Sequence, residues 1–343
     1  MSRKEFAIRV VIVLALVLVP ILVYRLFDVV LIGVGAILVA TILRLGTEPL
    51  RRLNLPQPVA LALSGFAILI ILGGASYLFG TKMMVEMQDV LHRVASAQGS
   101  LMHALNASSF GKLVLSHVSR ENVSLTSLIG NIFSLSSSFL EAVIVSVFTG
   151  VYLAAQPRLY RRGFCRLLPE SWRDEAMETI DHLGHALRLW LLGQLIQMVI
   201  IGLLSTLAAF AIGLPSPLAI GLIAGVAEFI PYLGPIISAV PAVLVAATVN
   251  GSAIVWTIVA WLLIHQVEGE LIAPIVQRSM VFMPPVVMLM SVATLTYLFG
   301  WMAIIFAAPI TVIVCVSVIK LYVRDSLGNW MPLPGETGRE GKQ

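Results

Sequence analysis

Apolar runs recur along the whole of this 343-residue chain, and several approach the length that crosses a lipid bilayer. They cover residues 10–24, 29–42, 58–79, 139–155, 189–212, 217–249, 253–265, 284–299 and 302–323. A helix spans a hydrocarbon core about 30 Å thick with roughly 20 residues, because each residue adds about 1.5 Å. Charged residues are 12% of the chain, whereas a soluble domain carries about 25%. We therefore predict an all-α, polytopic integral membrane protein with about eight transmembrane helices.

The basic residues predict which segments face the cytoplasm. Residues 44–56 carry three arginines against one acid, and residues 156–173 carry five arginines against one acid. Residues 82–138 are nearly neutral. The positive-inside rule places the two basic segments and both termini in the cytoplasm, with residues 82–138 outside. The net charge of +4 is thus a topology signal, and we expect no nucleic-acid partner.

These signals divide the chain into six segments. The extracytoplasmic segment has apolar residues at helical spacing, which favours helices lying over the membrane or a partner subunit, with a flexible linker as the alternative. Ser171 and Asp174 predict a capping box at the start of a cytoplasmic helix. The segments are an N-terminal three-helix membrane region (1–81), an extracytoplasmic amphipathic segment (82–138), a transmembrane helix (139–156), a cytoplasmic basic amphipathic segment (157–187), a C-terminal transport core with broken helices (188–324) and a flexible cytoplasmic tail (325–343).

One apolar run is interrupted by a carboxylate and two prolines. Glu228, Pro231 and Pro235 lie in an otherwise uncharged stretch, and proline removes a backbone donor and clashes with the preceding turn. We predict two half-helices, about 217–229 and 235–249, that form a hairpin dipping into the membrane. Broken helices often hold substrate or ions in transporters, so Glu228, Pro231, Tyr232, Gly234 and Pro235 are candidate pathway residues. The structural alternative is a protonated Glu228 that only caps the break.

A second group of polar residues follows a later apolar run. Gln266 and Glu270 are four residues apart and share a helix face, while His265 and Glu268 are three apart and share another. Either face could relay protons or bind a cation. The alternative is an interfacial helix end in which Glu268 or Glu270 pairs with Arg278.

Further candidates come from single positions. Gln194 and Gln197 share a helix face and suit either interhelical hydrogen bonds or substrate contact. Pro274 and Pro309 are candidate hinges, and a tight external hairpin is expected at Gly300.

The sequence contains no credible nucleotide-binding, zinc-protease or Ser-His-Asp pattern. Cys165 and Cys315 are far apart and lack metal-ligand spacing, so we predict no disulfide and no metal site. We expect no catalytic residues, no cofactor and no enzyme activity.

Several separate blocks resemble one transporter family. They are residues 213–221, 228–235 and 241–245 in the centre, then 265–270, Pro274, 284–288 and 307–309 toward the C-terminus. In these blocks the chain is similar to the AI-2E (autoinducer-2 exporter, PerM-like) family of bacterial transporters. The resemblance implies export of small signalling molecules in some members and exchange of sodium or lithium for protons in others. It also implies a homo-oligomer with around eight spans per subunit.

The first functional hypothesis is a secondary transporter in the bacterial cytoplasmic (inner) membrane that exports a small polar organic solute such as an autoinducer-2-like signal. Gln194, Tyr232 and Gln266 would give it hydrogen bonds. The first alternative is a Na⁺(Li⁺)/H⁺ antiporter that uses Glu228, Glu268 or Glu270. A membrane scaffold is the second, although a scaffold has no need of broken helices. The expected partners are a small-molecule or cation substrate, membrane lipid and further copies of the chain.

Overall fold

The computed structural model describes residues 25–51, 53–70, 85–86, 88–90, 92–93, 137–272, 284–300 and 302–333. Every regular element within these ranges is a helix, which confirms the all-α prediction. Among the described residues, four helices are long and apolar enough to cross a membrane, and a bent helix pair would make a fifth. The chain is a polytopic membrane protein, while the count of eight spans stays a prediction. The first predicted span, residues 10–24, lies outside the described residues.

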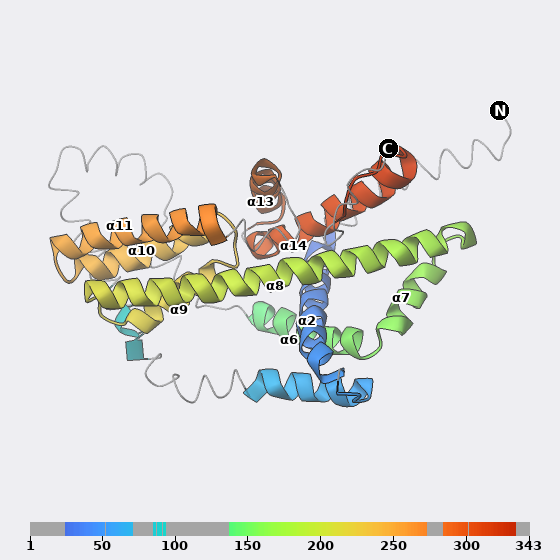
Figure 1. The fold of residues 1–343 in the computed structure, drawn as a ribbon, viewed down its shortest axis with the longest axis horizontal. Coiled ribbons are helices and arrows are strands. Elements are labelled where there is room, and N and C mark those ends of the chain that lie inside the picture. The colour runs from blue at the N-terminus through green and yellow to red at the C-terminus, as the bar shows by residue number, and fades with distance from the viewer. Residues whose placement is uncertain are drawn as a thin grey trace.

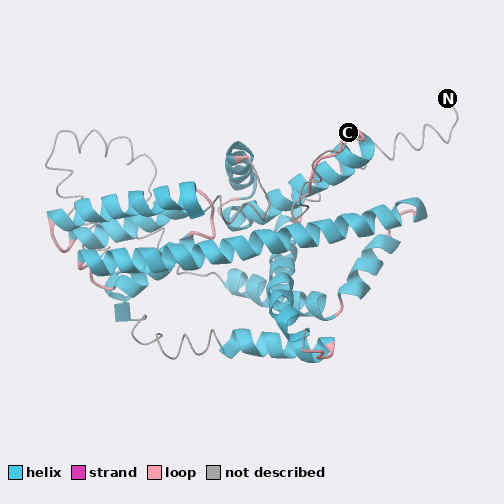
Figure 2. Cartoon of the chain, viewed as in Figure 1, coloured by secondary structure: helices cyan, strands magenta, loops and turns pink. Residues whose placement is uncertain are grey.

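The longest helix, α8 (Arg173–Ile212), is the axis of the molecule (Figure 1 and Figure 2). α9 (Pro217–Ala227) and α11 (Gly251–Val267) pack along its C-terminal half, and α10 (Gly234–Ala247) packs against α9 and α11. We call these three and the C-terminal half of α8 the four-helix bundle. Their buried apolar side chains form one continuous core.

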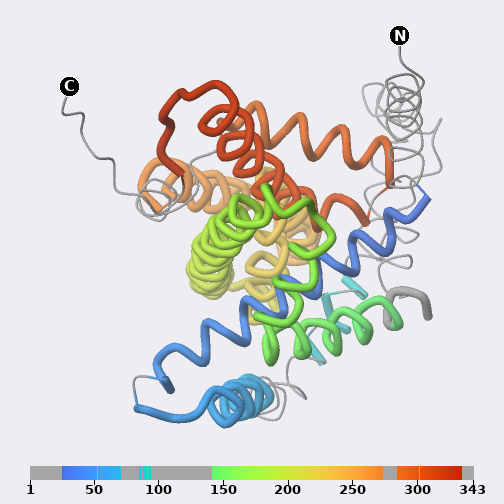
Figure 3. Tube along the Cα trace, turned by 90° about the vertical axis from the view of Figure 1, so that its right-hand side faces the viewer, coloured from blue at the N-terminus to red at the C-terminus, as the bar shows by residue number. Residues whose placement is uncertain are grey.

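A second group of helices crosses α8 near its middle (Figure 1), and the view roughly along α8 shows these helices on more than one side of it (Figure 3). α14 and α2 contact α8 directly, α6 packs against α2, and α13 packs against α14. The bounds are Phe27–Arg51 for α2, Ser137–Ala155 for α6, Pro157–Arg166 for α7, Pro285–Phe299 for α13 and Met302–Ser317 for α14, with an unlabelled apolar helix at Gln57–Ile70.

The start of α8 differs from the prediction. Ser171 lies in a short 3-10 helix, η1 (Glu170–Trp172), and no side chain forms a capping hydrogen bond at the start of α8. The predicted capping box is therefore wrong, because Ser171 belongs to a turn that precedes the cap position. α8 then continues for 40 residues until Gly213 ends it with a left-handed backbone (φ 80°). The predicted amphipathic segment before residue 188 and the span after it are parts of this one helix.

α6 and α7 meet at a sharp bend. Pro157 opens α7, and the two helices are inclined by 92° across this break. A proline at the first helical position is compatible with a new helix but not with continuation of the old one. α7 carries four arginines within ten residues, so it is unsuited to the hydrocarbon core. The bend agrees with the predicted boundary at residues 156 and 157.

Small residues let α9 lie close against α8. A Cβ added to Gly225 would lie 2.7 Å from the Met198 carbonyl oxygen and 3.1 Å from the Gly202 Cα. A Cβ added to Gly221 would lie 2.6 Å from the Gly202 carbonyl oxygen. Gly221 and Gly225 form a G-x-x-x-G pattern, which lets helix backbones approach in membranes. Glycine at these positions therefore sets the depth at which α9 packs.

α9 and α10 form the predicted hairpin. The helices have 11 and 14 residues, about 16 and 21 Å, so neither alone crosses a 30 Å hydrocarbon core. Pro235 lies in the first turn of α10, where proline starts a helix without loss of a hydrogen bond. A Cβ on Gly234 would lie 2.7 Å from the Ala227 carbonyl oxygen, so only glycine fits the crossing point. We call residues 228–233 the hairpin tip.

α13 and α14 form the predicted tight hairpin. Gly300 ends α13 with φ 81°, a backbone conformation that favours glycine. Pro309 lies inside α14 with its side chain fully buried. Its role as a hinge stays a prediction, and Pro274 lies outside the described residues.

Ion pairs join the N-terminal half of α8 to the second group of helices. Arg188 makes a bidentate ion pair with Glu48 of α2. Lys320, in the π-helix η3 (Val318–Ser326), contacts Glu178 at 3.0 Å and Asp325 at 3.1 Å. This end of α8 is thus the charged end of the molecule, where the positive-inside rule expects the cytoplasm.

Large apolar side chains cover the outward faces of the helices. Phe148, Phe210, Trp256, Leu262 and Met290 are each 61 to 74% exposed, although each lies in an apolar helix. Water-soluble monomers rarely expose apolar surface on this scale. These faces are suited to lipid or to another subunit.

Candidate functional site

Glu228 lies where α9 ends and the hairpin tip begins. Its side chain is buried, with 3% exposed, and its Oε2 atom has no hydrogen-bond partner among the described residues. The end of α9 leaves backbone carbonyls without helical donors. Gln194 Nε2 on α8 donates a 2.6 Å hydrogen bond to the carbonyl oxygen of Glu228. Gln194 therefore anchors the backbone of the tip and leaves the Glu228 carboxylate available.

His265 and Glu268 form the predicted pair at the end of α11. His265 Nδ1 lies 2.7 Å from Glu268 Oε2, and both side chains are more than four-fifths buried. Glu268 opens the short π-helix η2 (Glu268–Ile272), a wider turn that often marks functional positions. The Nε2 atom of His265 is buried and has no partner in the protein. When Nδ1 donates to Glu268, Nε2 presents its lone pair to the interior.

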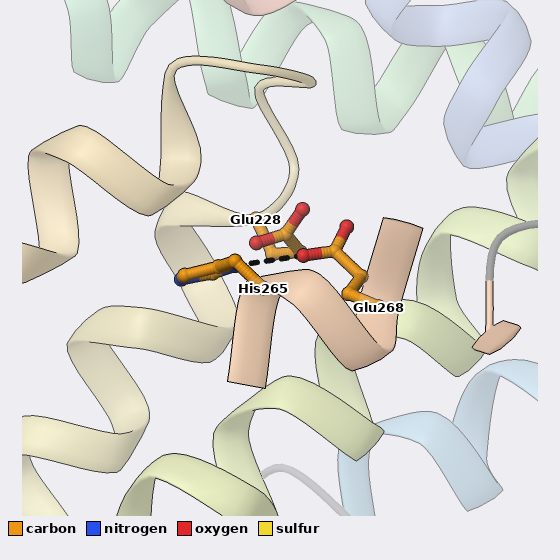
Figure 4. Close-up of side chains that lie close together, drawn as sticks. All are labelled: Glu228, His265 and Glu268. Carbon is orange, nitrogen blue, oxygen red and sulfur yellow. Dashed lines mark hydrogen bonds and ion pairs between the residues drawn. The ribbon is translucent and has the colours of Figure 1, made fainter. Parts of the chain in front are cut away.

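The fold brings the side chains of Glu228, His265 and Glu268 together, although 36 residues separate Glu228 from His265. One ligand atom of each, from Glu228, His265 and Glu268, lies within 4.8 Å of the others (Figure 4). We call this group the acidic cluster. Two buried carboxylates beside one imidazole need added positive charge, because a buried charge is costly without a partner. The donor set can hold a proton or a small metal cation, whereas the sequence predicted no metal site.

Aromatic side chains hold the hairpin tip against α8. The rings of Trp190 and Phe229 pack edge to face with centroids 5.9 Å apart. Tyr232 has a left-handed backbone (φ 66°) and a 45% exposed side chain. The tip is therefore fixed on the side of Glu228 and open on the side of Tyr232.

The other predicted residues lie around the cluster. Gln266 donates a hydrogen bond to Glu270, as their spacing predicted, and both side chains are exposed. Gln197 is half-buried on α8, one turn beyond Gln194, and Pro231 is half-buried in the hairpin tip. The alternative pairing of Glu268 or Glu270 with Arg278 cannot be placed, since Arg278 lies outside the described residues.

A set of polar residues in the bundle core was not predicted from the sequence. Ser205 and Thr257 are fully buried, and Ser238 is 2% exposed. Trp261 Nε1 donates a 3.3 Å hydrogen bond to the Ser238 hydroxyl. Their spacing in the sequence could have indicated this set, because Thr257, Trp261 and His265 follow one another at intervals of four on one helix face.

A short piece of the segment predicted to be extracytoplasmic covers the end of the hairpin opposite its tip. Glu86 Oε2 accepts a 3.2 Å hydrogen bond from the Ala219 backbone N–H in the first turn of α9. Asp89 accepts one from the Ser216 hydroxyl at 3.2 Å, and Val90 is buried in the bundle core. Arg93 contacts Asp89 at 2.7 Å and reaches Thr248 at the end of α10.

This piece, residues 85–93 as far as they are described, therefore clasps both ends of the hairpin. The hydrogen bond and charge of Arg93 hold the pKa of the Asp89 carboxyl below its ordinary value. A lowered pKa in the folded state stabilises the docked state above the unfolded value of about 3.9. That contribution is lost as the pH falls through the lowered value. The clasp is thus expected to be unchanged from pH 8 to 5 and to loosen only in stronger acid.

We expect Asp89→Asn to loosen the clasp at pH 7. The substitution removes the charge that Arg93 contacts, so the backbone around Ser216 to Ala219 should exchange its amide hydrogens faster, roughly threefold to tenfold for a partly exposed pair. Hydrogen-exchange mass spectrometry, corrected for intrinsic rates, measures this. Asp174→Asn, at an exposed position in the first turn of α8, is the matched control. Equal protection in all three proteins would contradict the prediction.

The sequence of the chain matches one protein family and is similar to several known proteins. The family model described as "AI-2E family transporter" matches residues 6–324. "Putative transport protein YrrI" of Bacillus subtilis (strain 168) is 31% identical over 168 residues, 49% of this chain and 48% of the relative. "Putative transport protein YueF" of the same organism is 24% identical over 209 residues, 59% and 57% of the two chains. A "Putative transport protein" of Thermotoga maritima is 27% identical over 184 residues, 53% and 56%. The chain thus spans about half the length of the curated relatives it matches.

Proposed function

Because the chain belongs to the AI-2E transporter family, and is thus a membrane transporter, we propose that it works as a secondary transporter that exchanges protons for Na⁺ or Li⁺ at the acidic cluster. The observation that carries this proposal is the meeting of Glu228, His265 and Glu268 at the tip of a broken helix pair. Unwound backbone at membrane depth is typical of ion sites in secondary transporters.

The charge of the cluster supports exchange. A buried pair of carboxylates is costly without positive charge, and either a proton or a metal cation can supply it. A site that accepts one or the other, and that opens to each side of the membrane in turn, couples their movements. Oxygen ligands suit hard cations such as Na⁺ and Li⁺, and Glu228 and Glu268 supply two carboxylates.

The anchoring of the hairpin tip supports a moving part at this position. Gln194 and Trp190 hold one side of the tip to α8, whereas Tyr232 on the other side is half exposed. Short half-helices joined by a glycine crossing can shift as a unit. We propose that the hairpin alternates between two positions and that cation binding at Glu228 favours one of them.

Export of a small polar organic solute is the second candidate. The description of the matching family model, which names AI-2E transport, favours it, and Tyr232 offers an accessible hydroxyl near the cluster. The amides of Gln194 and Gln266 are engaged by Glu228 and Glu270, so a solute would have to displace those bonds. In either case we propose a homo-oligomer in the bacterial inner membrane, with the charged end of α8 in the cytoplasm.

Proton flux in vesicles separates the two candidates. Purified protein in liposomes with an internal pH dye is given Na⁺, Li⁺, K⁺ or a panel of small polar metabolites on the outside. Antiport predicts alkaline or acid pulses with Na⁺ and Li⁺ that protein-free vesicles lack. Uptake of a metabolite without any response to the cations would overturn antiport and favour solute export.

A further inference from the structure

Two hydroxyl groups in the core of the four-helix bundle have no hydrogen-bond partner in the part of the chain that the structure describes. They belong to Ser205 of α8 and Thr257 of α11, and both residues are 0% exposed. Buried hydroxyls in helices ordinarily bond to the carbonyl four residues earlier. Thr206, Thr296 and Thr311 do so here, at 2.8, 2.6 and 2.7 Å. Ser205 and Thr257 are thus exceptions that need an explanation.

Both exceptions face the same core. Ser205 lies one turn from Ile201 and one turn from Ala209, and both neighbours belong to the bundle core. Thr257 lies one turn from Ala253 and one turn from Trp261, which belong to the same core. Residues four apart lie on one helix face, so both hydroxyls lie on helix faces that contribute to the bundle core.

The face of α11 that carries Thr257 also carries His265 of the acidic cluster. His265 is one turn beyond Trp261 on α11, and its Nε2 atom is buried without a protein partner. At about 1.5 Å per residue, Trp261 lies about 6 Å and Thr257 about 12 Å from the level of His265. Ser205 lies about 16 Å along α8 from Gln194, which marks the level of Glu228.

The spacing of these polar groups suits bridging water molecules. Successive polar groups are separated by about 4 to 6 Å along the bundle axis. One water molecule that makes two hydrogen bonds of about 2.8 Å bridges about 5.6 Å. The Ser238 hydroxyl of α10, which accepts from Trp261 Nε1 and donates to the Pro235 carbonyl oxygen at 3.2 Å, keeps one lone pair for a water molecule. A buried water molecule ordinarily bonds to two to four polar groups, and α8, α10 and α11 supply such groups here.

We propose that His265 Nε2, Ser238, Thr257 and Ser205 line a water-filled route that carries protons between the acidic cluster and the clasped end of the four-helix bundle. The role of the protons rests on the proposed function. The route itself rests on the buried polar groups that lack a partner among the described residues. A hydrogen-bonded file of water passes a proton by successive transfers, each oxygen taking one proton and releasing another. The route ends near Ser216 and Thr248, where the clasp meets the hairpin.

Removal of the hydroxyls should slow proton flux without loss of stability. Thr257→Val and Ser205→Ala keep the shape of the core, and neither deletes a hydrogen bond within the protein. We expect cation-driven proton flux to fall roughly tenfold or more in each variant, with an unchanged melting temperature. Thr311→Val, which removes a buried hydroxyl bonded to its own helix, should keep wild-type flux. Wild-type flux in both Thr257→Val and Ser205→Ala would overturn the route.

Thiol labelling tests the route without reference to transport. In a background with Cys165→Ser and Cys315→Ala, the Thr257→Cys variant should react with 2-aminoethyl methanethiosulfonate, a small water-borne reagent. Val312→Cys, at a fully buried apolar position of α14, should not react. An unreactive thiol at position 257 overturns the route. A reactive thiol in a protein that shows no cation-driven proton flux supports the route and overturns the proposed antiport instead.

Discussion

Glu228→Gln is expected to abolish cation-driven proton flux while the protein still folds. Glutamine matches glutamate in shape, but it cannot take up a proton or carry the negative charge that attracts a cation. We expect a loss of roughly two orders of magnitude or more, to the level of protein-free vesicles. The measurement is the pH-dye assay in liposomes with Na⁺ and Li⁺ pulses.

The structure explains why this substitution should leave the fold intact. The bond that anchors the hairpin tip joins Gln194 to the backbone carbonyl of Glu228, and the side-chain Oε2 atom has no protein partner. Glu270→Gln is the matched control, because Glu270 is an exposed acid of the same region that pairs with Gln266 outside the acidic cluster. It should keep most of the flux.

Two outcomes would contradict the assignment of Glu228. Full flux in Glu228→Gln would mean that its carboxyl only caps the break in the helix. Loss of flux in Glu270→Gln, with retention in Glu228→Gln, would move the site to the exposed pair at Gln266. A melting temperature and elution profile like those of the wild type are required of each variant before flux is compared.

Gly225→Ala is expected to have the largest effect on stability. The new methyl group would lie 2.7 Å from the Met198 carbonyl oxygen and 3.1 Å from the Gly202 Cα, and both are backbone atoms that no side-chain rotation can move. α9 must therefore shift away from α8, which separates the hairpin from Gln194. Overpacking of this kind costs about 1 to 3 kcal/mol, or a fall of several degrees in melting temperature.

Gly184→Ala provides the control for this prediction. Gly184 lies in the N-terminal half of α8, and an added Cβ would meet nothing within 4 Å. Alanine favours helix over glycine by about 1 kcal/mol, so this variant should be as stable as the wild type or more so. Thermal unfolding in detergent, followed by size-exclusion chromatography of heated samples, compares the three proteins. Equal melting temperatures for Gly225→Ala and the wild type would show that the helices are less tightly packed than the glycines imply.

Local pattern was sufficient to predict the hairpin and the polar pairs. Pro231 and Pro235, four residues apart, both disfavour a continuous helix, so the break near Glu228 could be predicted from backbone chemistry. The pairing of His265 with Glu268, and of Gln266 with Glu270, followed from helical periodicity. The capping box at Ser171 failed because competing turn geometry, here the 3-10 helix η1, decides where a helix begins.

The sequence by itself determined the membrane class, the broken helix pair and the local pairs, since hydropathy, proline and helical spacing act within a few turns of the chain. The tertiary structure alone decided that Glu228 meets His265 and Glu268, because that contact depends on how α9 and α11 pack against α8. It also decided that Gln194 binds a backbone carbonyl and that Ser205 and Thr257 face one core. Contacts between residues distant in sequence are set by side-chain packing across helices, and that packing leaves no periodic trace in any single segment.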